Sequence, residues 1–289
     1  ILYRDGNLLS YTAQDAVSGL ELWRTDGTEA GTFMVKDLLP GSVGMQPREF
    51  VSLGSSVLFA IRGGTGINNE LWISDGTEAG TQVVRPVSLG GDMITSPSML
   101  TPGPGGFVYF AATVVRSPST QFGIELCKTD GTAANTVMVK DIYPASASCQ
   151  PRFLAYQGGL LNFNAFSSIG DEIWISDGTS AGTTLLKDIA PTPFSAGPGR
   201  RRSLGTQSCF SANDGTNGTE LWITNGSTAG TQLLADVRPG AASASPFAMQ
   251  SKANKVFFSA QTGADGLEFW ATDGTTPGTQ RLLDVQSSV

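Results

Sequence analysis

One twelve-residue motif occurs six times in this chain, and its repetition limits the folds that the chain can adopt. Its regular form is E-L-W-x-T-D-G-T-x-A-G-T, and successive copies begin 47 to 55 residues apart. The copies are Glu21–Thr32, Glu70–Thr81, Glu125–Thr136, Glu172–Thr183, Glu220–Thr231 and Glu268–Thr279. Repetition with this period indicates an architecture that is assembled from copies of one supersecondary unit.

The second repeat shows what one unit contains. Its apolar and β-branched runs predict strands, and the Gly-rich or Ser-rich turns between them suit antiparallel hairpins. The predicted strands are Glu49–Leu53, Val57–Arg62, Glu70–Ser74 and Gln82–Val87. Four strands in a repeat of this length are typical of a propeller blade, whereas a helical solenoid needs a 3.6-residue periodicity that this sequence lacks.

The 289 residues therefore predict an all-β fold, a single six-bladed β-propeller domain of four-stranded antiparallel blades that close into a ring. The composition agrees, because 36 glycines and only 15% charged residues suit short strands joined by tight turns. The predicted blades span approximately 1–40, 47–90, 97–143, 151–191, 200–239 and 246–289.

Charge and hydropathy argue against nucleic-acid binding and against a membrane-spanning segment. A net charge of −7 disfavours a nucleic acid, whose phosphates need a basic face. No apolar stretch approaches the roughly 18 residues that cross a bilayer, so we predict a chain that does not span a membrane. Because the chain opens with Ile-Leu-Tyr-Arg, without an initiator Met or a signal region, we expect a mature or excised piece of a precursor.

The motif also carries a family resemblance. With the residues that follow it, the repeat resembles the ELWxxDGT repeat family, whose units occur in tandem in large secreted or surface proteins. The matching residues of the first copy are Glu21, Trp23, Asp26, Gly27, Thr28, Gly31, Thr32, Lys36 and Asp37. Four positions depart from the pattern, at Cys127, Asn135, Asn225 and Ala235. The resemblance implies an extracellular or cell-surface location and implies no catalytic residue.

A tryptophan stands at one fixed place in five repeats and has two interpretations. The five are Trp23, Trp72, Trp174, Trp222 and Trp270. Aromatic side chains in tandem could stack on carbohydrate. A side chain that almost every blade carries is more often needed for packing, so we predict that each Trp lies in the core between blades.

The leading glutamates suggest either acid–base chemistry or a structural ion pair. In four repeats a base follows the Glu by 15 residues. The pairs are Glu21 with Lys36, Glu70 with Arg85, Glu125 with Lys140, and Glu172 with Lys187. A hairpin folded around D-G-T-x-A-G-T would place these charges opposite each other, Trp23 opposite Met34 and Thr25 opposite Thr32. We therefore predict cross-strand ion pairs.

The aspartates of the D-G-T turns are candidate calcium ligands or candidate turn residues. They are Asp26, Asp75, Asp130, Asp177 and Asp273. Calcium usually takes several carboxylates from one loop, and each of these loops carries a single such Asp. We therefore predict that these aspartates hydrogen-bond the turn backbone, and we predict no metal site. The three cysteines, Cys127, Cys149 and Cys209, also lack metal-ligand spacing.

The stretches that break the repeat are the candidates for recognition. Arg200, Arg201 and Arg202 fall where the fifth repeat should begin a strand, and together they are candidate ligands for a carboxylate, sulfate or phosphate. The non-repeating segments Thr101–Phe122 and Pro191–Leu204 are the predicted binding surfaces, since expanded loops usually carry recognition. Asn217 and Asn225 begin glycosylation sequons, which matter if the source glycosylates secreted proteins.

The functional prediction follows from what the chain lacks. It has no histidine, and no nucleophile elbow, phosphate loop or dinucleotide fingerprint is visible, so we predict no catalytic residue and no cofactor. We expect a non-enzymatic extracellular or cell-surface module for adhesion, surface assembly or matrix structure. Its partner would be a protein, a surface glycan or another copy of the chain. The alternatives are a glycan-binding, lectin-like propeller and a polysaccharide hydrolase or lyase.

Overall fold

Strands make up nearly all of the regular structure. The structure is a computed structural model, and it describes residues 2–5, 8–61, 69–85, 92–117, 120–144, 147–191, 195–263 and 265–283. Within these ranges the helical content is about 1%, in the 3-10 turn η2 (Pro104–Gly106). None of the described helical residues forms a segment long and apolar enough to cross a bilayer.

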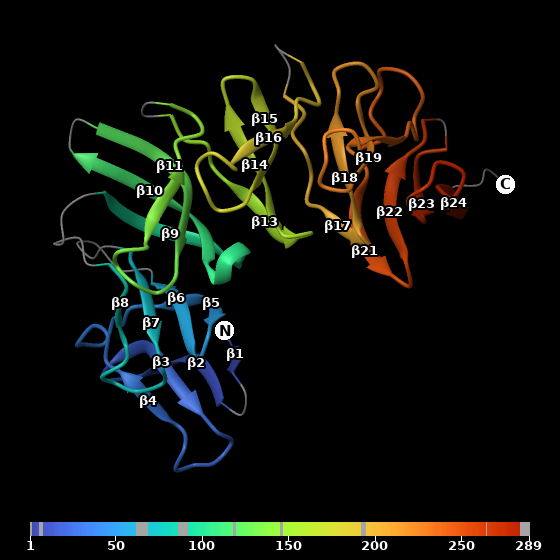
Figure 1. Ribbon diagram of the computed structural model, residues 1–289. Helices are drawn as coiled ribbons and strands as arrows, with labels where there is room; N and C mark the ends of the chain where they lie inside the picture. Colours follow the sequence, from blue (N-terminus) through green and yellow to red (C-terminus); the bar gives the residue numbers. More distant parts are fainter. Residues whose placement is uncertain are drawn as a thin grey trace. The chain divides into compact units, whose positions relative to one another are not determined.

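Six four-stranded antiparallel sheets follow one another along the chain (Figure 1), which confirms the all-β class and the four-stranded repeat. In every sheet the strands neighbour one another in sequence order. The first three sheets are β1 (Leu2–Asp5), β2 (Leu8–Asp15), β3 (Gly19–Thr25) and β4 (Phe33–Lys36); β5 (Pro47–Leu53), β6 (Ser56–Ile61), β7 (Leu71–Ser74) and β8 (Gln82–Val83); and β9 (Met93–Pro102), β10 (Val108–Ser117), β11 (Thr120–Thr129) and β12 (Val137–Lys140). The last three are β13 (Arg152–Gln157), β14 (Leu160–Ser167), β15 (Gly170–Ser176) and β16 (Thr184–Lys187); β17 (Arg202–Leu204), β18 (Gln207–Asn213), β19 (Thr219–Thr224) and β20 (Gln232–Ala235); and β21 (Phe247–Lys252), β22 (Lys255–Gln261), β23 (Leu267–Thr272) and β24 (Gln280–Leu283).

The strands predicted for the second repeat correspond to β5 to β8. Three ends coincide, at Leu53, Ser74 and Gln82, and the others differ by one to four residues, since β5 already begins at Pro47 and β8 ends at Val83. Arg62 and residues 86–87 of the predicted strands lie outside the described residues.

The chain forms two compact units. One comprises Ile1–Tyr156 with Gly178–Ser180 and holds the first three sheets, and the other comprises Gln157–Asp177 with Ala181–Val289 and holds the fifth and sixth. The boundary falls within the fourth sheet, since β13 belongs almost wholly to the first unit and β14 to β16 belong almost wholly to the second. Within a unit the first strands of successive sheets approach each other, as β1 and β5 do and as β17 and β21 do. This is the arrangement of neighbouring propeller blades. The single-domain division with its six blade ranges stays a prediction.

The hydrophobic core is divided into layers between successive sheets. Between the first and second sheets, Leu22 and Val35 pack with Phe59 and Ile61. Between the fifth and sixth, the core residues come from β17 to β22. Each fully buried Leu, Ile or Phe contributes about 1.5–3 kcal/mol, so the sheets are held together mainly by what lies between them.

In five of the six sheets, all but the second, the described last hairpin contains a bulge that the sequence pattern did not predict. Trp23 lies opposite Met34, as predicted, but Lys36 lies opposite Leu22 rather than Glu21. The same shift occurs between β15 and β16, where Lys187 lies opposite Ile173. A bulge adds one residue to one strand and so moves every later pair by one. The extra residue is apolar and buried, as Val35 is, and fills the layer between the sheets.

Candidate functional site

Four of the repeated glutamates, Glu21, Glu125, Glu172 and Glu220, are buried acceptors for backbone N–H groups, so the ion pairs predicted for the first three are wrong. Glu172 accepts hydrogen bonds from the backbone of Ile189 at 3.0 Å and of Ala196 at 3.1 Å, which lie 17 and 24 residues further along the chain. Glu125 and Glu220 make the equivalent pairs of bonds. Burial raises the pKa of Glu21, Glu125 and Glu172 to about 7. Each Glu therefore fixes the segment that leads into the next repeat.

The cations predicted to pair with these glutamates contact the following sheet instead. The Nζ of Lys36 donates to the carbonyl of Thr81 at 2.8 Å, and the Nζ of Lys187 donates to that of Thr231 at 2.6 Å. Arg85 donates to the carbonyl of Ala133 in the third sheet. In the first and fourth sheets the bulge places the Lys opposite the residue after the Glu. All three cations serve as bridges between sheets.

The D-G-T aspartates bond the turn backbone, as predicted. Oδ1 of Asp26 accepts hydrogen bonds from the backbone N of Thr28 at 2.9 Å and from its hydroxyl at 2.7 Å. These bonds lower the pKa of Asp26. Asn225 accepts the same two bonds from Ser227, which shows that one carbonyl-type oxygen is enough. A Cβ added to Gly31 would meet the Asp26 carboxylate where it now lies. The third repeat has Asn135 at this position, and its side chain donates to Asp130 at 2.6 Å. Across the described ranges, no three His, Cys, Asp or Glu side chains gather as a metal site.

Three of the five tryptophans, Trp72, Trp222 and Trp270, pack between sheets, which confirms the structural interpretation for them. Trp222 is 5% exposed and belongs to the layer that Ile173 and Leu186 form on the fourth sheet. The Nζ of Lys187 lies 5.8 Å from the centre of its ring. Trp72 packs against the core layer between the first and second sheets, and Trp270 packs against the layer between the fifth and sixth.

The longer third repeat is extended by strands more than by loops. β10 continues to Ser117 and pairs with β11 as far as Thr120, so most of Thr101–Phe122 is regular sheet. Arg116 forms an ion pair of 2.8 Å with Asp92, and its guanidinium lies over the Phe122 ring. Residues 118–119 of this predicted binding segment lie outside the described residues.

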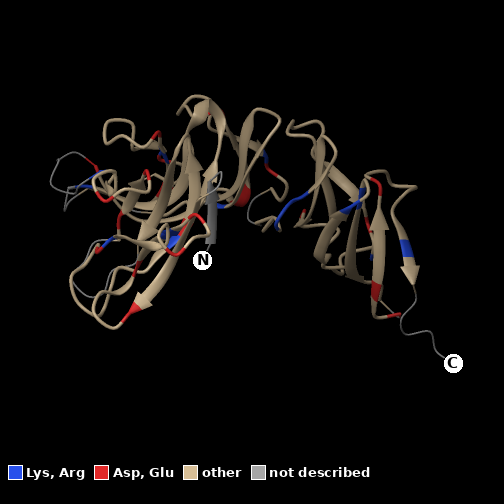
Figure 2. Ribbon diagram, turned by 90° about the horizontal axis from the view of Figure 1, so that it is seen from below, with Lys and Arg blue, Asp and Glu red and all other residues tan. Residues whose placement is uncertain are grey.

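Basic residues are scattered among acidic ones over the described strands and turns of both units (Figure 2). The arginine run is the place where three stand together, and the structure divides them between two sides of the fifth sheet. Successive side chains in an extended segment point to opposite faces. Arg201 points toward the fourth sheet, where its Nη1 donates to Oδ1 of Asn164 at 2.9 Å. Arg202 points toward the sixth, where its Nε donates to the carbonyl of Met249 at 2.6 Å. The predicted three-arginine site therefore does not form as one cluster. Residues 192–194 of the segment Pro191–Leu204 lie outside the described residues.

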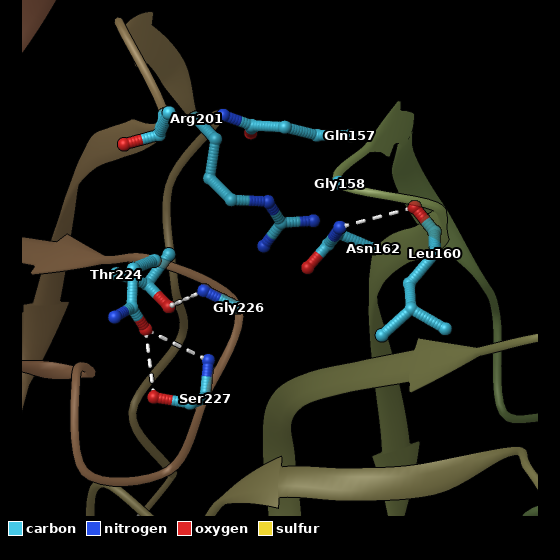
Figure 3. A pocket seen from close by; sticks show the side chains of 10 residues that line it. Gln157, Gly158, Leu160, Asn162, Arg201, Thr224, Gly226 and Ser227 are labelled. Atoms are coloured by element: carbon cyan, nitrogen blue, oxygen red, sulfur yellow. Dashed lines mark hydrogen bonds between the residues drawn. The ribbon is translucent and has the colours of Figure 1, made fainter.

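Arg201 lies in a pocket of about 210 Å³ between the fourth and fifth sheets, inside the second unit. Figure 3 shows its guanidinium directed into the space beside Asn162, with the turn of Thr224, Gly226 and Ser227 on the opposite wall. The Asn162 side chain is 6% exposed and donates to the carbonyl of Leu160 at 3.3 Å. Burial lowers the pKa of Arg201 to about 10. The pocket thus holds a cation in a polar, partly enclosed space.

Arg200 and Arg202 line a second hollow of about 270 Å³ with Phe247 and Met249. Arg200 is exposed, so the charge on this side is well hydrated.

The two predicted sequon asparagines differ in exposure. Asn225 is exposed in its turn. Asn217 is half-buried, and its side chain donates to Asp214 at 2.8 Å. Use of either sequon stays a prediction. Cys127, Cys149 and Cys209 are free thiols in buried positions.

Comparison with known proteins yields matches in structure alone. No family model matches the chain, and no curated protein matches it. Three solved structures share its fold: a puromycin-hydrolysing peptidase from Mycobacterium tuberculosis (15% identity, TM-score 0.53), a prolyl endopeptidase (12%, 0.56) and oligopeptidase B from Leishmania major (12%, 0.56). The matches cover 100%, 100% and 98% of this chain and 46%, 44% and 41% of those chains. The chain therefore spans less than half the length of these proteins, and the part it matches is their β-propeller domain.

These matches correct the functional prediction. The three structures that share this fold are peptidases, which contradicts the predicted non-enzymatic module for adhesion, surface assembly or matrix structure and the prediction that the protein is not an enzyme. The reason for the error is physical. The repeated Glu, Trp and Asp residues build sheets and junctions, and a propeller of either kind needs those, so their pattern says nothing about catalysis.

Proposed function

We propose that this chain is the β-propeller domain of a larger hydrolase of the peptidase type. The observation that carries the proposal is the likeness to the propeller domains of three peptidases over at least 98% of the chain. These 289 residues contain no histidine, so in this proposal the base of a Ser-His-Asp triad would come from outside the chain. In this proposal the chain positions substrate or the catalytic domain, and the nucleophile and base come from outside it.

Labelling with a fluorophosphonate, which reacts with activated serine nucleophiles, tests this proposal. The full-length protein that contains the chain should be labelled, and peptide mapping should place the label outside these 289 residues. The isolated chain, as the matched control, should stay unlabelled and should not cleave peptides. A full-length protein that neither reacts with the probe nor cleaves peptides would refute the proposal.

We further propose that the six sheets close into a six-bladed ring. The support comes from the outer face of the sixth sheet, where Phe269 is 42% exposed although its counterparts Ile173 and Leu221 are fully buried against a following sheet. Closure against the first sheet would cover this face. A compact chain of this length has a radius of gyration of about 19 Å, which small-angle scattering can measure. A clearly larger radius for the monomer would rule out the ring.

Two further expectations stand as proposals on the motif alone. We propose that the chain belongs to the ELWxxDGT repeat family and that it works outside the cell or at its surface. Fractionation of source cells, followed by mass spectrometry of the repeat peptides, tests the location. Recovery of these peptides only from the cytoplasm would overturn it.

A further inference from the structure

The hollow between the fifth and sixth sheets is where two cations of the arginine run share one surface. Arg200 and Arg202 both line this hollow of about 270 Å³, together with Phe247 and Met249. It lies between β17 and β21, the first strands of the two sheets, which lie side by side in the second unit (Figure 1). The residues that line it, all in the described part of the chain, include no Asp or Glu. Two positive charges therefore stand together without a lining carboxylate in a protein whose net charge is −7.

The two guanidiniums are available to a ligand in different ways. Nε of Arg202 donates to the carbonyl of Met249 at 2.6 Å, which orients the group and leaves its two Nη atoms without a partner among the described residues. The Arg200 side chain is exposed and has no hydrogen-bond or ion-pair partner among those residues. One cation is thus held in place, and the other can adjust to a bound anion. Because two like charges in one hollow repel each other, anions bound there would relieve the repulsion.

The spacing of the two arginines determines the geometry of the ligand. Alternate residues of an extended segment lie about 6.6 Å apart and point to the same face. An extended peptide has the same repeat, so two acidic side chains separated by one residue would meet Arg200 and Arg202 in register. Each carboxylate can accept two N–H groups from one planar guanidinium. The hollow therefore matches a pair of carboxylates at alternate positions of an extended chain.

The strands that border the hollow favour a peptide as that chain. β17 pairs only with β18 and β21 only with β22, so each is the edge strand of its sheet. An edge strand is a common place for an extended peptide to bind, with alternate side chains of the peptide entering pockets. The carbonyls of Ser203 and Met249 already accept hydrogen bonds from Ser251 and Arg202, so side chains would supply the affinity here. Phe247, which is 51% exposed, adds apolar surface at the hollow.

We propose that this hollow, which we call the Arg200–Arg202 hollow (Gly199, Arg200, Arg202, Ser211 and Pro246–Met249), binds an extended acidic peptide through two carboxylates at alternate positions. Its volume accommodates on the order of nine water-sized groups, which is about the size of two glutamate side chains. The proposal deepens the peptidase role, and the choice of a peptide over another polyanion rests on that role. It makes acidic peptide segments the substrate class that this propeller domain holds.

Calorimetry on the whole chain at low salt tests the proposal with three acetylated and amidated pentapeptides. Ala-Glu-Ala-Glu-Ala has the proposed spacing, Ala-Glu-Glu-Ala-Ala has the same composition with adjacent carboxylates, and Ala-Gln-Ala-Gln-Ala lacks the charges. We expect saturable binding of the first peptide, binding of the second that is weaker by about threefold or more, and none of the third. Binding of the first should weaken as salt is raised. Equal binding of the first two, saturable binding of the third, or no saturable binding of the first would each overturn the proposal.

Matched variants assign the binding to the hollow. Arg200→Gln removes the exposed charge and should weaken binding of the first peptide by about threefold or more. Lys252→Gln removes one positive charge from an exposed position of β21 outside the hollow and should leave binding unchanged. Arg202→Lys keeps the charge but loses the two-point geometry, so it should weaken binding as well. Unchanged binding in Arg200→Gln, or equal weakening in Lys252→Gln, would refute the assignment.

The peptide experiment and the fluorophosphonate experiment can fail separately, because binding is measured on the chain alone and needs no catalysis. A full-length protein that is labelled, with a chain that binds no peptide, would overturn this inference and leave the peptidase role standing. Peptide binding by the chain, with neither labelling nor cleavage by the full-length protein, would do the reverse. Inorganic phosphate and an oligogalacturonate should bind the chain more weakly than Ala-Glu-Ala-Glu-Ala. Tighter binding of either would overturn the choice of a peptide.

Discussion

Glu172 shows how much a single side chain of the repeat does. Its carboxylate is fully buried and receives two backbone N–H groups from the segment that leads to the fifth sheet. The hydrogen bonds favour the ionised form, but the loss of hydration outweighs them, so the pKa rises from 4.5 to about 7. A residue that looked like a candidate acid–base catalyst is therefore a structural clamp whose charge is unfavourable in the folded state.

The raised pKa values predict that stability falls between pH 4.5 and 7. Below pH 4.5 the glutamates are protonated in both the folded and the unfolded chain. Above pH 7 they are ionised in both, and the folded state bears the cost of the buried charge. Urea unfolding should give a higher free energy at pH 5 than at pH 8, and Glu172→Gln should reduce this difference. A free energy that rises from pH 5 to pH 8 would contradict the prediction.

The hydrogen bonds of the D-G-T turns predict how two substitutions of Asp75 change stability. Asp75 accepts two hydrogen bonds from Thr77, at 2.9 and 2.7 Å, and Asn225 makes the same bonds to Ser227. Asp75→Asn should therefore be nearly neutral. Asp75→Ala loses both bonds and should cost about 1–2 kcal/mol. Thermal unfolding of the two variants decides the matter, and equal losses would show that the side chain oxygen is not what holds the turn.

At the scale of the element, the hairpin of β3 and β4 has some features that the sequence predicts and one, the bulge, that it does not predict. The repeated pattern of apolar runs and turn residues predicts the hairpin, the pairing of Trp23 with Met34 and the bond between Thr25 and Thr32. It does not predict the bulge, because Val35 looks like any other strand residue and its burial depends on the neighbouring sheet. The Glu and Lys positions after the bulge were consequently misplaced by one residue.

The bulge residue itself should be one of the costly positions to truncate. Leu186 occupies it in the fourth sheet, is 2% exposed and packs in the layer that contains Trp222. Leu186→Ala should lower the free energy of unfolding by about 2–5 kcal/mol. Thr184→Ala, two residues earlier on the same strand and exposed, should stay within about 0.5 kcal/mol. Similar small losses in both variants would mean that the junction does not depend on this side chain.

The candidate site was only half predictable for a related reason. The arginine run stood out because it broke the repeat, and the strand expected there is β17, which begins at Arg202, directly after Arg201. That Arg202 faces the sixth sheet while Arg201 faces the fourth depends on where the strand begins, which the sequence pattern does not predict. The sequence pattern also did not predict the contact of Arg201 with Asn164, because that contact depends on how the fifth sheet packs on the fourth.

For the molecule as a whole, stability depends on the hydrophobic layers between successive sheets. The stability of a variant in the sixth sheet therefore tests the proposed closure of the ring. Phe269→Ala removes a side chain that is 42% exposed. If the first sheet covers this face, the variant should lose about 3–5 kcal/mol, as expected for a buried Phe, and it should resemble Leu221→Ala in the fifth sheet. A loss below about 0.5 kcal/mol would show that the face is open to solvent.

The bond from Ala196 to Glu172 also has a consequence for synthesis on the ribosome. The carboxylate lacks its second donor until a residue 24 positions later has been made. A sheet of this kind is therefore complete only after the chain that starts its successor has left the exit tunnel. Folding then follows translation in order, one sheet behind the point of elongation, and a pause in translation between two repeats leaves the last sheet made without its clamp.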